Sequence, residues 1–64
     1  MEALFDNIRA ECARKHWSIA RFCIMLDIDR KRFYGWQQRK DLPTSYLVKM
    51  AKLFGTTTDE LLGL

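Results

Sequence analysis

The chain has 64 residues, of which 48% are hydrophobic and 30% are charged, a composition typical of a globular protein rather than a disordered one. We expect a single domain over residues 1–64, because no second domain fits in a chain of this length. A domain of this size buries only about 60% of the surface that its unfolded chain exposes. The formal net charge of +3 permits an acidic partner such as nucleic acid, but it would also suit many ordinary proteins.

The sequence has no secretory hydrophobic region near its first residues and no apolar run long enough to span a membrane. Cys12 and Cys23 could in principle form a disulfide. A chain without an export signal is expected to stay in the cytoplasm, where thiols are kept reduced. We therefore expect a cytoplasmic protein with no membrane partner and with two free cysteines.

The first two helices are predicted from the spacing of apolar residues. In residues 4–15 these recur at helical intervals, and charged side chains occupy the opposite side. Ser18 is a favourable N-cap for a second helix over residues 19–26. Trp17, just before this cap, can pack on Phe22 as a hydrophobic staple, which would fix the direction in which the second helix starts.

A sharp break after the second helix precedes a third. Asp27 enters the left-handed region more readily than most residues other than glycine, and Asp29 can cap the free amides of a helix over residues 30–38. Phe33 and Trp36 are about one helical turn apart, so both are expected on the buried face of this helix. The same helical period turns Arg30, Lys31 and Tyr34 away from the core.

Two more helices are predicted in the C-terminal third of the chain. Pro43 is disfavoured inside a helix but suits its start, so we expect a fourth helix over Thr44–Phe54, ended by Gly55 in a left-handed conformation. Its inward-facing residues are expected to be Leu47, Met50, Ala51 and Phe54. Residues 57–60, Thr-Thr-Asp-Glu, match a capping box that opens a short fifth helix through Leu62. No segment is a strand candidate, so the predicted fold is all-α with five short helices.

Positive charge gathers on the third helix and on the segment after it. Between residues 30 and 40 there are five cations and no acid, and aspartates flank this block on both sides. Two short helices joined by a tight turn of three or four residues form the helix-turn-helix, in which the second helix projects side chains into the major groove of DNA. Cys23 would be the small residue at the crossing of the two helices.

Three segments extend the pattern over most of the chain: IRAECARKHWS from residue 8, FYGWQQRKDLP after it, and LVKMAKLFGTTTDELLGL at the end. Together they resemble the Cro and phage-repressor family of helix-turn-helix proteins, also called the lambda-repressor-like or XRE family. Several positions depart from that pattern. Ile19 stands where a glutamine is frequent, and the glycine usual after the third helix is missing around Arg39 and Lys40, so a differently shaped loop is expected.

The resemblance implies a sequence-specific regulator of transcription that binds double-stranded DNA, of the phage or prophage repressor type, in a bacterial cell or the host cell of a phage. It implies that Arg30 and Lys31 face base edges, where both residue types donate to guanine. Tyr34 would flank them, and Gly35 would let the helix come closer to the bases. Contacts to the DNA backbone are implied for six residues: Ser18, Arg32, Arg39, Lys40, Thr44 and Ser45.

The last helix often mediates dimerisation in this family. The resemblance therefore implies a weak homodimer through the C-terminal helix. Apolar residues near the end of the chain could belong to such a contact or be exposed without a function. These residues are Leu61, Leu62 and Leu64.

Neither a metal nor another cofactor is expected. Cys12 and His16 are four residues apart, but with Cys23 they supply only three soft ligands, and Cys23 is assigned to the helix crossing. A nucleophilic Cys-His pair would also need oxyanion donors and an orienting group, and none is evident. We therefore expect a protein that is not an enzyme.

Other interpretations of the same residues remain open. The cations of residues 30–32 could form an ordinary solvated helix face, and Phe33 and Trp36 could stack on single-stranded bases, although their spacing favours the core. Ile24 and Met25 are apolar where the second helix would normally be charged, so they could be exposed without a function, which is the usual case, or contact a partner. The functional alternative is an antitoxin or another protein-interaction module that uses the same fold.

Overall fold

The computed structural model describes residues 2–64 of the chain, with side chains from residue 3 onward. This part of the chain contains no strand, and the expected all-helical architecture is confirmed. None of its helices combines the length and the apolar character that crossing a membrane requires. The elements are α1 (Glu2–Arg14), α2 (Ile19–Met25), α3 (Arg30–Arg39), α4 (Thr44–Phe54) and α5 (Thr58–Leu62).

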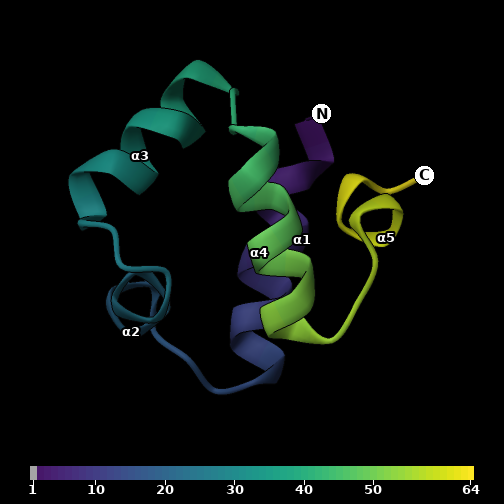
Figure 1. Cartoon of the computed structure of the whole chain (residues 1–64), viewed down its shortest axis with the longest axis horizontal. Helices are drawn as coiled ribbons and strands as arrows, with labels where there is room; N and C mark the ends of the chain where they lie inside the picture. Colours follow the sequence, from purple (N-terminus) through teal and green to yellow (C-terminus); the bar gives the residue numbers. More distant parts are fainter. Residues whose placement is uncertain (1) are drawn as a thin grey trace.

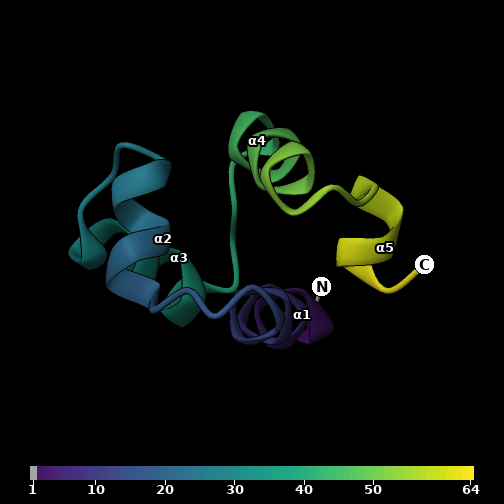
Figure 2. The ribbon, with the colours of Figure 1, turned by 90° about the horizontal axis from the view of Figure 1, so that it is seen from below.

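Helix α1 is the element against which the rest of the fold is organised. It contacts α2 near one end of the molecule and α5 at the other, while α4 contacts α5 and α2 contacts α3. In two perpendicular views, α2 and α3 lie on one side of α1 and α4, and α5 lies on the opposite side (Figures 1 and 2). The α2–α3 pair and α5 are therefore separate regions that share the core between α1 and α4.

A chain of aromatic contacts connects four of the helices through this core. Phe33 of α3 packs edge-on against Phe5 of α1 and Phe22 of α2, with ring centroids 5.9 and 6.2 Å apart. Phe22 in turn stacks on Phe54 of α4 at 5.0 Å. Trp17, expected to pack on Phe22, stacks on Phe54 at 5.9 Å, so Phe54 links the two residues of the predicted staple.

The core residues predicted for α3 and α4 are mostly confirmed. Phe33 and Trp36 are buried, and on α4 the side chains of Met50, Ala51 and Phe54 are also buried. Two residues differ from the prediction. They are Leu47, which was expected to face inward and is half-buried, and Leu42, which lies in the loop before α4 and is buried although no helical pattern marked it.

Helix α5 is held against α1 by one buried leucine and one hydrogen bond. Leu61 is only 1% exposed, and the side-chain amide of Asn7 donates a hydrogen bond to its carbonyl oxygen at 2.8 Å. Leu61 therefore belongs to the core of this chain and is not available to a partner. Of the other two C-terminal leucines, Leu62 is half-buried and Leu64 is 88% exposed.

The five helices end in the same main-chain arrangement. After each helix a residue with positive φ donates its N–H to the carbonyl three residues earlier, and the next residue donates to the carbonyl five residues before itself, which is the Schellman motif. Two of the positive-φ residues are glycines, and Asp27 was predicted in this conformation. The full set is His16, Asp27, Lys40, Gly55 and Gly63.

Candidate nucleic-acid interface

Helices α2 and α3 each begin at a side chain that accepts a hydrogen bond from the first turn. The Ser18 hydroxyl accepts the N–H of Arg21 at 3.1 Å, and the Asp29 carboxylate accepts the N–H of Arg32 at 2.9 Å. Both caps were predicted from the sequence. They fix the residues at which the two helices start, because each cap satisfies a main-chain donor that the helix itself leaves without an acceptor.

The turn between α2 and α3 is tight because main-chain bonds close it. Asp27 has φ of 59°, and the N–H of Ile28 donates to the carbonyl of Cys23 at 3.0 Å. The side chain of Ile28 packs against the core, and Cys23 is only 1% exposed. The turn is therefore anchored at both ends, which holds α3 at a fixed angle to α2.

Helix α3 buries one face and presents the opposite face to solvent. Because Phe33 and Trp36 point into the core, the helical period turns Arg30, Lys31 and Tyr34 outward, and the structure has all three exposed. Gln38, which was not singled out from the sequence, is exposed one turn beyond Tyr34 on the same side. We define the outward face of α3 as Arg30, Lys31, Tyr34, Gly35 and Gln38.

The ring of Tyr34 is supported by a buried aromatic residue. Its ring packs edge-on against buried Phe33, with centroids 5.9 Å apart, while 47% of the residue remains exposed. An aromatic side chain held in this way keeps a hydroxyl that can donate or accept a hydrogen bond at the surface.

A second group of cations lies where α3 meets α4. The guanidinium of Arg32 is 5.7 Å from the centroid of Trp36 and 5.5 Å from that of Tyr46, and the ammonium of Lys49 is 5.1 Å from Tyr46. The two rings contact each other at 4.9 Å. Stacking on aromatic faces orients a guanidinium while its N–H edge stays available to an oxygen acceptor. The sequence did not point to Lys49. It comes close to Arg32 only in the folded structure, where both cations lie over the ring of Tyr46.

Arg39 lies back along α3 instead of extending away from it. A Cβ added to Gly35 would be 3.2 Å from the Nη1 atom of Arg39 and 3.8 Å from both its Cζ and its Nη2 atoms. Gly35 was expected to let the helix approach DNA closely. In the structure a cation of the same helix occupies the space beside it.

The remaining predicted backbone contacts lie in the connection to α4. Lys40 is exposed with φ of 54°, so a lysine adopts the conformation for which the sequence pattern led us to expect glycine. Thr44 and Ser45 are exposed at the start of α4, ahead of the first N–H groups that bond to the carbonyl of Pro43. Their amides are among the donors that a helix leaves free at its beginning.

The thiols are placed in the core and not at a surface site. Cys12 and Cys23 are both free and buried. Burial raises the pKa of Cys12 to about 11 and also raises the pKa of Cys23, although the nearby Arg30 opposes the second shift. Both sulfurs are therefore neutral near pH 7 and poorly nucleophilic. His16 is exposed in the turn after α1, and in residues 3–64 no three His, Cys, Asp or Glu side chains group as metal ligands would.

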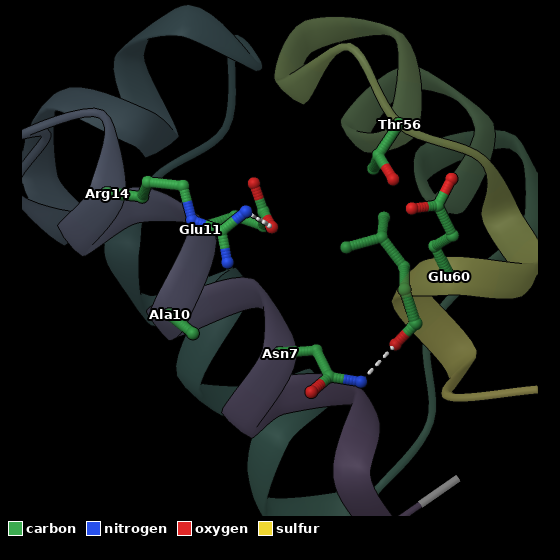
Figure 3. A pocket seen from close by; sticks show the side chains of 7 residues that line it. Asn7, Ala10, Glu11, Arg14, Thr56 and Glu60 are labelled. Carbon is green, nitrogen blue, oxygen red and sulfur yellow. Dashed lines mark hydrogen bonds and ion pairs between the residues drawn. The ribbon is translucent and has the colours of Figure 1, made fainter.

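A hollow of about 250 Å³ lies on the other side of the molecule, between α1 and α5 (Figure 3). Glu11 and Arg14 form an ion pair at 3.1 Å on the α1 side, and Thr56 and Glu60 lie across from them. Two carboxylates and one guanidinium give this lining a net negative charge. Such a surface repels phosphate, so the hollow is not a candidate for contact with nucleic acid.

Comparisons with protein-family models, with curated proteins and with solved structures find no match. Support for a function therefore comes from the residues of this chain and from their geometry. The charge of the outward face of α3 and the charge of the hollow beside α5 have opposite signs. Only the former suits a polyanion.

Proposed function

We propose that this chain is a sequence-specific regulator of transcription that binds double-stranded DNA through a helix-turn-helix formed by α2 and α3, as in lambda-repressor-like proteins. The observation that carries the proposal is the division of α3 into two faces. Phe33 and Trp36 are buried, while Arg30 and Lys31 are exposed directly after a capped, tight turn. A helix-turn-helix needs its exposed cations at this place, because the start of its second helix meets the base edges.

In the proposed complex the first turn of α3 enters the major groove. Arg30 and Lys31 donate to O6 and N7 of guanine, which predicts a half-site that contains guanine. Tyr34 flanks these contacts on the outward face. Arg32, oriented by Trp36 and Tyr46, donates to a phosphate at the edge of the groove, and such a contact positions the protein without selecting a sequence.

Other groups extend the proposed contact along the DNA backbone. The Ser18 hydroxyl, which accepts a bond from Arg21, still has its own proton to donate to a phosphate oxygen. Lys40 and the amides of Thr44 and Ser45 supply donors at the loop between α3 and α4. With Arg32, these groups make up five of the six residues for which the family resemblance implies a backbone contact, Arg39 being the sixth, and they would fix the register of α3 in the groove.

The proposed regulator acts by occupying an operator and thereby excluding the transcription machinery from a promoter. A weak homodimer through the C-terminal helix would place two copies of α3 on half-sites about 34 Å apart, one turn of DNA. Leu61 is excluded from that contact because it lies in the core, so Leu64 and the exposed part of Leu62 would form it. Binding, and not catalysis, is the proposed activity.

Selection from a pool of random duplexes, followed by affinity measurements over a range of salt concentrations, tests the proposal. We expect one enriched sequence and a logarithmic salt slope of about −0.9 for each phosphate contacted. Arg32→Ala should weaken binding to all sequences alike. A folded protein that enriches no sequence, or whose affinity does not change with salt, would contradict the proposal.

One observation favours a second candidate, an antitoxin or another protein-interaction module. Ile24 of α2 is 76% exposed, and Met25 beside it is also exposed, so α2 presents two adjacent apolar side chains that a partner protein could cover. A gene for a small toxic protein directly beside the gene for this chain, together with rescue from that toxin on co-expression, would support it. Ile24→Glu should then abolish rescue while leaving binding to duplex DNA unchanged.

A further inference from the structure

The position of the Arg39 guanidinium follows from helix geometry. Side chains on an α-helix tilt toward its N-terminus, so a long side chain covers the turn before its own Cα atom. Arg39 is four residues after Gly35, and its guanidinium lies against that glycine with Nη1 3.2 Å from where a Cβ would be. Its charge is therefore located about one turn closer to the start of α3 than its place in the sequence indicates.

No feature of the backbone requires glycine at this position. Gly35 lies inside α3, where glycine is unfavourable, and it is not among the residues with positive φ. What glycine provides is space, because a Cβ at 3.2 Å would force the guanidinium of Arg39 to move by a few tenths of an ångström. The guanidinium of Arg39 therefore occupies the space that the missing Cβ of Gly35 leaves on the helix surface, and we call this space the notch.

The notch lies on the outward face of α3. Gly35 is one turn beyond Lys31, so the two positions share a side of the helix. A guanidinium held at Gly35 extends the row of donors that Arg30 and Lys31 begin. Arg39 has a planar fork with parallel N–H groups, which fits the paired O6 and N7 acceptors of guanine in the major groove.

We propose that Arg39 is a specificity-determining residue, which reads a guanine from the notch at Gly35 and replaces the base contact that glycine itself cannot make. The family resemblance implies a phosphate contact for Arg39, so this is a different role. The proposal rests on the proposed DNA-binding function. It adds a third base-reading cation to Arg30 and Lys31.

The test is selection from random duplexes at one fixed salt concentration, followed by affinities for the selected duplex and for each of its single-base changes. Arg39→Lys keeps the charge but loses the planar fork. We expect it to keep the affinity for random DNA while losing selectivity at one base pair, with the preferred duplex bound on the order of 10- to 100-fold more weakly. Arg39→Ala should lose selectivity at the same base pair and bind all DNA less tightly as well.

Gly35→Ala provides an independent variant, since alanine favours the helix and does not threaten folding. It should reduce selectivity at the same base pair as Arg39→Lys, by a smaller factor, because the guanidinium is displaced and not removed. Lys52→Ala is the matched control, since it removes an exposed cation from the last turn of α4. It should leave the selected sequence unchanged.

Two results would overturn the inference while the parent protein still selects a sequence and so keeps its proposed function. In the first, Arg39→Ala weakens binding to every duplex alike and Arg39→Lys behaves as the parent does, which identifies a phosphate contact. In the second, Gly35→Ala and Arg39→Lys affect different base pairs. A folded parent protein that selects no sequence overturns the proposed function and this inference together.

Discussion

Helices α3 and α5 begin with the same kind of cap but carry charges of opposite sign in their first turns. Each begins at a side chain that caps the first turn, Asp29 for α3 and Thr57 for α5. The first turn of α5 carries two acids, whereas that of α3 carries no acid and opens with Arg30 and its two cationic neighbours. Acids are favourable near the positive end of a helix dipole and cations are not, so α5 follows the electrostatic preference of a helix and α3 opposes it.

The difference shows that the helix dipole does not favour the charges of α3, of which only Arg32 stacks on aromatic rings within residues 3–64. Each cation in its first turn is unfavourable by about 0.3–1 kcal/mol at low ionic strength, and the carboxylate of Asp29 offsets only part of this. Arg30 and Lys31 are exposed at this end of the helix, and a bound anion would offset their unfavourable position. An anion brought to the start of α3 would meet the side-chain cations and the helix dipole together.

Substitutions in the core give the largest expected effect, because both helices depend on it. Trp36→Ala in α3 should lower the free energy of unfolding by about 3–5 kcal/mol, and Leu61→Ala in α5 by about 2–5 kcal/mol. Both side chains are buried, and Trp36 also supports Arg32 and Tyr46. Urea unfolding followed by circular dichroism measures both values. A loss below 1 kcal/mol for Trp36→Ala would mean that α3 is not anchored as described.

High pH should destabilise the core on the α1 side of the molecule. Burial, with a contribution from Cys23, raises the pKa of Cys12 from its ordinary value of 9.0 to about 11, so the folded state holds this proton more tightly than the unfolded state does. The resulting stability is fully present below pH 9 and is lost as the pH rises toward 11. The loss should reach about 2–3 kcal/mol at 1.36 kcal/mol for each pKa unit.

The control for this titration is Cys12→Ala, which lacks the thiol. Chemical unfolding at pH 8 and at pH 10.5 should show a smaller decrease in the free energy of unfolding for the variant than for the parent, because the variant has no thiol at this position to ionise. An equal decrease in the two proteins would show that the Cys12 thiol does not carry the effect.

A matched pair of arginine substitutions compares the two regions directly for DNA binding. Arg30→Ala should lower the affinity for the preferred duplex by about 1–3 kcal/mol and relax selectivity at one base pair, because it removes the proposed bidentate contact with guanine. Arg14→Ala removes the same charge from the hollow beside α5 and should leave selectivity unchanged. Fluorescence anisotropy at fixed salt measures both. Equal losses for the two variants would reduce the outward face of α3 to nonspecific attraction.

A charge exchange between the two helices has the smallest expected effect on stability. Lys31→Glu makes the first turn of α3 resemble that of α5 and should raise the free energy of unfolding by about 0.5–1 kcal/mol, while binding to DNA weakens. Asp59→Lys makes the reverse change in α5 and should lower stability by a similar amount. If Lys31→Glu lowered stability instead, the cations of α3 would have a structural role that the helix dipole does not describe.

Local signals were sufficient to predict much of this fold. Ser18, Asp29 and Thr57 each act as the cap that their residue type and position indicated, and the one-turn spacing of Phe33 and Trp36 placed both in the core. Such features depend on residues within a few positions of each other. A single sequence is therefore enough to find them.

The features that were missed depend on contacts between distant residues or on the path of a long side chain. Arg9 donates a hydrogen bond to Gln37 at 2.7 Å across 28 positions, and no periodic pattern predicts such a pair. Leu42 is buried although it lies in a loop. The guanidinium of Arg39 lies beside Gly35, about one turn before its own Cα atom, and the sequence alone does not indicate this path.

The turns that end α1, α2 and α3 place His16, Asp27 and Lys40 in the left-handed region, which costs an ordinary residue roughly 1–2 kcal/mol relative to a right-handed conformation. Glycine would remove this strain. Its greater conformational freedom in the unfolded chain would cancel part of the resulting gain in stability. His16 is the residue of the three that lies in neither the turn before α3 nor the loop after it. Stability can therefore be gained outside the outward face of α3. His16→Gly would let that face accept destabilising substitutions, and under the proposed function such substitutions would change the DNA sequence that it selects.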